Sequence, residues 1–118
     1  MSIVAELSNL KGVFAAGEYS YRGDRFTYKG QLDEEQARMA SIMCRATTMG
    51  VHMQADILGA YCGDQCAFTP SRGWVVRGPK FTVCVMANVF CFLDNANASM
   101  NDIIGLMYRR LADIEAIV

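Results

Sequence analysis

One segment constrains the fold of this chain more than any other, because residues 33–58 carry an uninterrupted helical pattern. When residues are placed about 100° apart, the apolar side chains fill two adjoining stripes. The first stripe holds Met39, Ile42, Met43, Ala46, Met53 and Ile57, and the second holds Ala40, Cys44, Val51, Ala55 and Leu58. An ordinary surface helix buries a single stripe about 100° wide. We therefore expect two packing partners for this helix: a sheet of its own domain and a second copy of the chain.

Polar residues keep only a narrow sector of the same helix, which holds Arg38, Ser41, Arg45, Thr48, His52 and Asp56. His52 is the only histidine, so any Cys-His or Ser-His-Asp catalysis would have to use it. Its place in the polar sector instead predicts a solvated or rim-facing side chain.

Composition limits the classes of function. The chain has 118 residues, which predicts a single domain over 1–118, and its hydrophobic content is 53% against about 45–50% in typical domains. A formal net charge of −1 gives no electrostatic case for nucleic acid or a membrane surface. The longest uncharged stretch, residues 81–93, has 13 residues, whereas a membrane-spanning helix needs about 20. Five cysteines without framework spacing and a first segment unlike a signal peptide predict reduced thiols and a cytoplasmic protein.

The remaining segments predict a mixed architecture around the long helix. Ser2 caps a short helix, residues 12–21 and 25–31 form a hairpin, and Asp33 begins the long helix, with Gln36 completing a capping box. Gly59 and Gly63 are expected to end that helix before a connecting loop over residues 64–72. Strands at 74–77, 81–87 and 89–93 follow, and Ser99 caps a closing helix. The last two strands are apolar on both faces, so we expect helices on both sides of the sheet.

Five segments together resemble the roadblock and dynein-light-chain family, and within it a small bacterial family of roadblock-like domains. They are GVFAAGEYS from residue 12, FTYKGQL from 26, DEEQARMASIMC from 33, the Phe68-Thr69-Pro70 and Gly73-Trp74 pair, and FTVCVMANVFCF from 81. The resemblance implies an α/β (α+β), profilin-like fold of order α-β-β-α-β-β-β-α. Its five-stranded antiparallel sheet would carry the long helix on one face and the terminal helices on the other. It also implies a homodimer made by the long helix and the edge strand that follows.

These expectations define a candidate interface and a candidate partner patch. The interface is predicted at Met39, Ile42, Ala46, Met49, Met53, Ile57, Trp74 and Val76. Arg72, Arg77 and Lys80 bracket Trp74 along the chain. They suit either an acidic protein partner or the protection of an edge strand by charge.

Candidate chemistry is sparse. Residues 12–17 have the two glycines of a phosphate-binding loop, but Glu18 and Tyr19 stand where Lys and Ser or Thr are required. Cys62 and Cys66 lie four apart beside a glycine, which suits a dithiol, part of a metal site, or simple packing at a helix end. A structural zinc site needs about four ligands, so this pair is incomplete. We expect no cofactor.

The function favoured by these observations is a non-enzymatic homodimeric interaction or regulatory module that binds a protein partner. Members of the wider family serve as scaffolds, regulators of small GTPases or motor adaptors, so the resemblance implies a scaffold or adaptor with a small GTPase among its candidate partners. Two alternatives stay open. One is a thiol- or metal-based sensor or carrier centred on Cys62 and Cys66, and the other is a sensor that holds a small ligand between sheet and helix.

Overall fold

The computed structural model describes residues 2–62 and 72–111, which form three helices and one antiparallel sheet. In chain order the elements are α1 (Ile3–Ser8), β1 (Val13–Tyr19), β2 (Phe26–Gly30), α2 (Glu34–Cys62), β3 (Gly73–Arg77), β4 (Phe81–Met86), β5 (Val89–Asp94) and α3 (Met100–Leu111). The five strands lie in the order β2-β1-β5-β4-β3, so the first and last hairpins meet where β1 pairs with β5. The fold class predicted from the sequence is confirmed.

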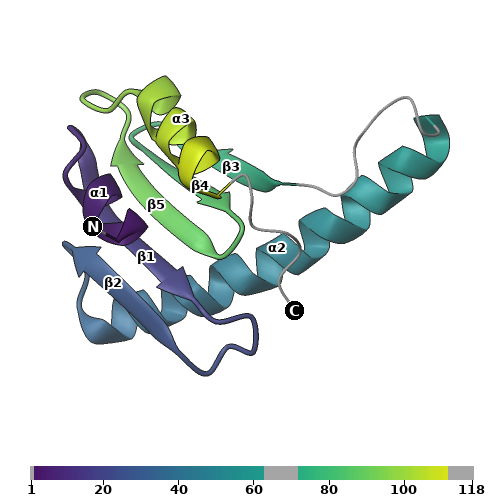
Figure 1. Ribbon diagram of the computed structural model, residues 1–118, viewed down its shortest axis with the longest axis horizontal. Helices are drawn as coiled ribbons and strands as arrows, with labels where there is room; N and C mark the ends of the chain where they lie inside the picture. Colours follow the sequence, from purple (N-terminus) through teal and green to yellow (C-terminus); the bar gives the residue numbers. More distant parts are fainter. Residues whose placement is uncertain (1, 63–71, 112–118) are drawn as a thin grey trace.

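The sheet separates two layers of helix (Figure 1). On one face α1 and α3 cover a core that includes Leu7, Cys91 and Ile103. On the other face α2 runs diagonally behind the strands, where Ala40, Cys44 and Phe90 share a second core. Because alternate residues of a strand point to opposite faces, β4 and β5 supply both cores, which explains their apolar character on both sides.

The caps predicted for the helices are present. The Ser2 side chain accepts a hydrogen bond from the backbone N–H of Ala5, and the Ser99 hydroxyl accepts one from Asp102. At the start of α2, the Asp33 carboxylate accepts from the backbone N–H of Gln36 at 2.7 Å, while the Gln36 side-chain oxygen accepts from the N–H of Asp33 at 3.0 Å. This reciprocal pair satisfies N–H groups that have no partner inside the helix.

The predicted end of the long helix was wrong. Gly59 does not stop α2, which continues to Cys62. A glycine inside a helix costs only about 1 kcal/mol relative to alanine, so it weakens a helix without ending it. Residues 63–71, which include the predicted Gly63 stop and most of the expected loop, lie outside the described part of the chain.

The 29 residues of α2 make it longer than its own sheet is wide. At about 1.5 Å per residue the helix spans about 43 Å. Five strands spaced about 4.8 Å apart span only about 19 Å between the outermost axes. The C-terminal part of α2 therefore extends beyond the sheet on the side of β3, as Figure 1 shows. We call this part of the helix, residues 53–62, the arm.

The polar sector of α2 does not face solvent throughout. Ser41 and Thr48 are buried against the sheet, alongside Ala37 and Cys44, whereas His52 is exposed as expected. The Ser41 hydroxyl donates to the carbonyl of Ala37 within the helix. A helical wheel cannot tell which side of a helix is inward when small polar residues find partners there.

The Thr48 hydroxyl connects three elements of the fold. Trp74 of β3 donates its indole N–H to Thr48 Oγ1 at 2.8 Å, and the Tyr19 hydroxyl of β1 lies 3.2 Å from the same atom. Tyr19 and Thr48 are both buried, so water cannot replace these bonds. The network fixes the rotation of α2 about its axis and therefore decides which side chains face away from the sheet.

We predict that Thr48→Val lowers the free energy of unfolding by about 1–3 kcal/mol, because it leaves the Trp74 and Tyr19 polar groups without their shared partner. Thr48→Ser keeps the hydroxyl and loses one methyl group, which costs about 1 kcal/mol. Urea denaturation of both variants measures the difference. Equal stability of the two would contradict the role given to the hydroxyl.

Candidate functional site

The side of α2 that faces away from the sheet is apolar along most of its length. We call its residues the outer stripe, and they are Met39, Ile42, Met43, Ala46, Met49, Met53 and Ile57. Their large side chains are exposed by 46–65%, and Tyr61 on the arm is exposed by 84%. Contiguous apolar surface of this kind on a soluble protein usually marks a binding site. Six members of this stripe belong to the interface predicted from the sequence.

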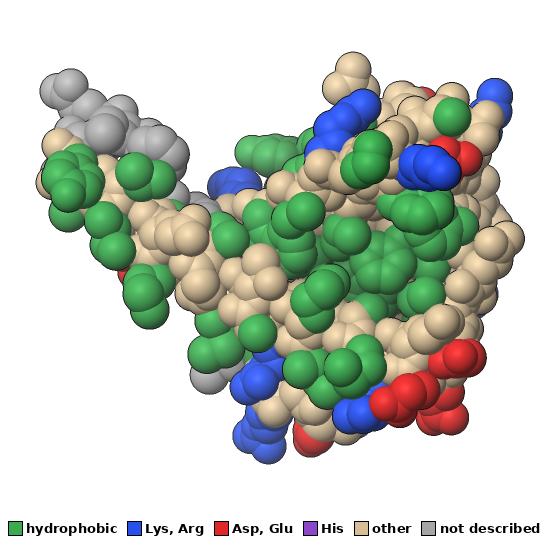
Figure 2. Space-filling view, turned by 180° about the vertical axis from the view of Figure 1, so that it is seen from behind, with side chains coloured by type: hydrophobic (Ala, Val, Ile, Leu, Met, Phe, Trp, Pro, Cys, Tyr) green, Lys and Arg blue, Asp and Glu red, His purple; other side chains and the backbone are tan. Residues whose placement is uncertain are grey.

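A second apolar surface lies on the sheet beside α2, and we call it the sheet patch. Val76, Val83 and Phe92 are neighbours across β3, β4 and β5, while Phe81 and Phe14 extend the row. The ring of Phe14 lies 5.2 Å from that of Phe81 and 6.0 Å from that of Phe92, between ring centroids. Figure 2 shows hydrophobic side chains gathered on the sheet next to the diagonal helix, and more of them along the projecting arm.

The sequence did not single out Phe14, Phe81, Val83 or Phe92 as surface residues. Their alternation predicted strands covered on both faces, which holds for the α1 and α3 side. On the other side α2 crosses the sheet at an angle and leaves this end of the strands uncovered, so Phe81 stays 57% exposed. The alternation of apolar residues shows which side chains share a face of the sheet, but no sequence pattern shows how much of that face the helix covers.

Strand β3 forms one edge of the sheet, and its outer side pairs with no described strand. Val75 and Val76 are exposed by 46% and 57%. Trp74, also predicted at the interface, is half-buried and bonded to Thr48 of its own chain. An edge strand with apolar side chains and open backbone groups is a template for pairing with another strand.

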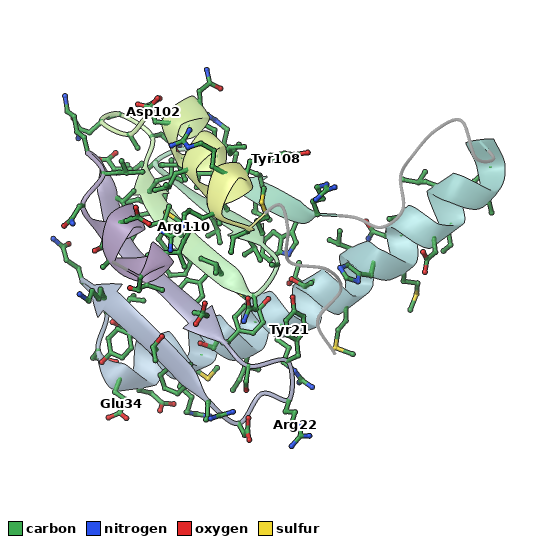
Figure 3. All side chains as sticks on the ribbon, in the orientation of Figure 1. Tyr21, Arg22, Glu34, Asp102, Tyr108 and Arg110 are labelled. Carbon is green, nitrogen blue, oxygen red and sulfur yellow. The ribbon has the colours of Figure 1, made fainter. Side chains whose placement is uncertain are left out.

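The structure places the basic residues of the predicted partner patch on the surface. Arg72, Arg77 and Lys80 are all exposed. The Arg72 guanidinium lies 5.5 Å from the centre of the Tyr108 ring, a cation–π contact with α3 (Figure 3 labels Tyr108). Trp74 turns toward α2, so it does not stand exposed between these cations. Whether this patch binds an acidic partner stays a prediction.

The candidate thiol centre lies largely outside the described residues. Cys62 closes α2, but its side chain is not described, and Cys66 falls in the gap at 63–71. Within residues 2–62 and 72–111, no group of three or more His, Cys, Asp or Glu side chains is placed to hold a metal ion. The other three cysteines, Cys44, Cys84 and Cys91, are buried. Burial raises the pKa of Cys44 and Cys91 to about 12 and that of Cys84 to about 11.

These pKa values predict that Cys44, Cys84 and Cys91 do not react with a water-soluble disulfide reagent at pH 8, because a neutral buried thiol is a poor nucleophile. In the double variant Cys62→Ser, Cys66→Ser, the folded protein is expected to show no fast-reacting thiol, and all three should react in urea. Fast reaction of this variant in its folded state would contradict the burial of the three thiols.

We also predict a loss of stability at alkaline pH. The unfolded thiols titrate near 9.0, while those of Cys44 and Cys91 titrate at about 12 in the folded protein. Above pH 9 the unfolded state therefore binds fewer protons than the folded state, and the free energy of unfolding falls as pH rises. Urea midpoints measured from pH 8 to 10.5 should decline. Cys44→Ala should make that decline shallower, and an unchanged slope would contradict the assignment.

The described part of the chain contains no helix long and apolar enough to cross a membrane. A family model described as "Uncharacterized conserved protein (DUF2173)" matches residues 3–109. The chain belongs to this family. DUF2173 thus covers every strand and nearly all of the three described helices.

Comparison with solved structures places this DUF2173 chain in the roadblock fold. The crystal structure of the Roadblock/LC7 domain from Streptomyces avermitilis superimposes with a TM-score of 0.57 and 15% sequence identity. The alignment covers 93% of this chain and 95% of that one. A comparison with curated proteins finds no match. The resemblance read from the sequence is therefore confirmed at the level of fold.

Proposed function

We propose that this chain is a non-enzymatic interaction module that works as a homodimer and presents a scaffold to a protein partner. The outer stripe is the observation that carries the proposal. Its large side chains expose 46–65% of their surface on one side of one helix, although the chain has a complete core on both faces of its sheet. Covering this stripe removes apolar surface from water, which is the main driving force of association.

The arrangement of the three surfaces favours a second copy as the cover. The arm extends past the β3 edge, and the sheet patch ends at that same edge with Val76. A two-fold axis beside β3 would bring the arm of each copy over the sheet patch of the other and lay the two outer stripes side by side. The two β3 strands would then pair, which satisfies their open backbone groups. Gly50, with nothing within 4 Å of an added Cβ, leaves room for close helix approach.

The amount of surface available is adequate for a stable dimer. Stable interfaces bury about 1,600 Å² in total, or about 800 Å² per partner. Nine large apolar side chains are available, and most of them are at least half exposed. They are the six large residues of the outer stripe together with Tyr61, Val76 and Phe81. Methionine supplies four of them, and its flexible thioether packs well against irregular surfaces.

In this proposal the dimer presents surfaces that remain open once the outer stripe of α2 and the backbone edge of β3 are covered. Arg72, Arg77 and Lys80 are exposed and supply positive charge beside the β3 edge, as an acidic protein partner would require. A small GTPase as that partner is the expectation carried by the family resemblance. The cytoplasm as the place of action is the expectation carried by the cysteine usage.

Met53→Glu tests the dimer. A carboxylate at a residue that is 65% exposed in the single chain costs little there, but burying it against a second copy is costly. Light scattering at micromolar concentration should give the mass of two chains for the wild type and one for Met53→Glu. Asn101→Glu is the control, since it adds the same charge at an exposed residue of α3, on the opposite face of the sheet, and should leave the dimer intact.

Two outcomes would contradict the proposal. One is a well-folded wild-type monomer at micromolar concentration. The other is a Met53→Glu protein whose mass equals that of Asn101→Glu. Circular dichroism of both variants shows whether either has simply unfolded.

A further inference from the structure

A pocket lies on the opposite side of α2 from the β3 edge, between the helix and the β1–β2 turn. Its volume is about 210 Å³. Four arginines line it, Arg22 and Arg25 from the turn and Arg38 and Arg45 from the helix, with Asp24 as the one carboxylate among its lining residues. A formal net charge of −1 for the whole chain makes this concentration of guanidinium groups unusual. Neither the family nor the proposed dimer accounts for it.

Arg45 is held in place at the back of the pocket. Its Nε donates to the backbone carbonyl of Tyr21 at 2.6 Å, and it forms no other hydrogen bond with the described residues. Gly23, at a φ of +81°, lies beside the guanidinium, which would be 3.3 Å from a Cβ at that position. The two terminal nitrogens of Arg45 are therefore fixed by the bond through Nε yet keep N–H donors for a ligand.

The turn that carries Arg25 is also ordered by its own hydrogen bonds. The Ser20 hydroxyl oxygen accepts from the backbone N–H of Asp24 and of Arg25, both at 3.1 Å, and donates to Asp24 Oδ1 at 2.7 Å. The Ser20 N–H also donates to the carbonyl of Arg25 at 2.9 Å. Asp24 uses its carboxylate to hold this turn, and Arg25 forms no ion pair with another described residue.

The other two arginines contribute less directly. Arg38 forms a bidentate ion pair with Glu35, which offsets its charge. Arg22 extends from the turn toward solvent in Figure 3, so it adds positive charge at the mouth rather than a contact inside. Arg25 and Arg45 are thus the two cations available to touch a ligand, one on each wall of the pocket.

We propose that this pocket binds the phosphate group of a small phosphorylated molecule. Guanidinium groups present paired N–H donors that match the oxygens of phosphate and carboxylate. The volume of about 210 Å³ lies below the 300–1,000 Å³ typical of sites for whole drug-sized ligands, so it suits one anionic group with the rest of the molecule outside. The guanidinium groups of Arg25 and Arg45 outnumber the one carboxylate of Asp24, so the net attraction is greater for a phosphate group than for a carboxylate, which carries less negative charge.

Titration with inorganic phosphate tests the site. The readout is the NMR signals of the backbone amides of Gly23, Asp24 and Arg25 in ¹⁵N-labelled protein. Ionic strength is kept constant with sodium chloride, and sodium acetate is titrated in parallel. We expect saturable shifts of these three signals with phosphate and weaker, non-saturating shifts with acetate. Arg25→Gln should weaken phosphate binding about tenfold, as expected when one charge-assisted hydrogen bond is lost.

Lys29→Gln is the matched control, because it removes one exposed positive charge from β2 without touching the pocket. It should leave phosphate binding unchanged. Three results would overturn the proposal: no saturable shift in the wild type, equal weakening in Arg25→Gln and Lys29→Gln, or acetate binding as tightly as phosphate. Spectra of both variants that match the wild type outside the turn show that the fold is kept. The pocket shares only Ile42 with the outer stripe, and its cations lie outside that stripe, so failure here leaves the proposed dimer standing.

Discussion

A single buried hydroxyl fixes the rotation of α2 about its own axis and so determines which of its side chains face the sheet. Thr48 accepts the indole N–H of Trp74 and contacts the hydroxyl of Tyr19, so one atom ties α2 to strands on both sides of the sheet centre. Rotating the helix by one residue would break both contacts and bury polar groups without partners, which is costly. The apolar outer stripe is exposed because this inner side is fixed. The orientation of α2 that Thr48 fixes also places Arg45 at the β1–β2 turn. The outer stripe and the pocket therefore both depend on the contacts of Thr48.

Much of the fold could be predicted from local patterns. The caps at Ser2, Asp33 and Ser99 follow from side chains that satisfy backbone N–H groups within three residues, and such interactions are visible in the sequence. The helix end was missed because a glycine changes stability by a small amount, and the sequence does not show what compensates for it. The inward side of α2 was ambiguous for a related reason. Ser41 and Thr48 appear polar along the chain, but their hydroxyls are satisfied within the fold, one by the helix itself and one by residues 26 and 29 positions away.

The candidate surfaces also divide into those that the sequence could predict and those that it could not. The outer stripe lies on one helix, so its periodicity alone reveals it. The sheet patch depends on the angle at which α2 crosses the strands, and the pocket depends on a turn and a helix about twenty residues apart in the chain meeting at Gly23 and Arg45. Neither angle nor meeting point is encoded in a repeating pattern. Surfaces built by one element could thus be predicted here, whereas those built between elements required the structure.

Four of the seven residues of the outer stripe are methionines, at positions 39, 43, 49 and 53. Methionine has three rotatable bonds and no branch at Cβ, so it adopts many shapes at little energetic cost. A surface of isoleucine or valine would accept only a narrowly matching partner. In the proposed dimer, the methionine side chains would absorb small shifts of one helix against its neighbour. Single changes in the contacting surface would then be accommodated without loss of the dimer, so this interface would tolerate sequence change better than one built from branched side chains.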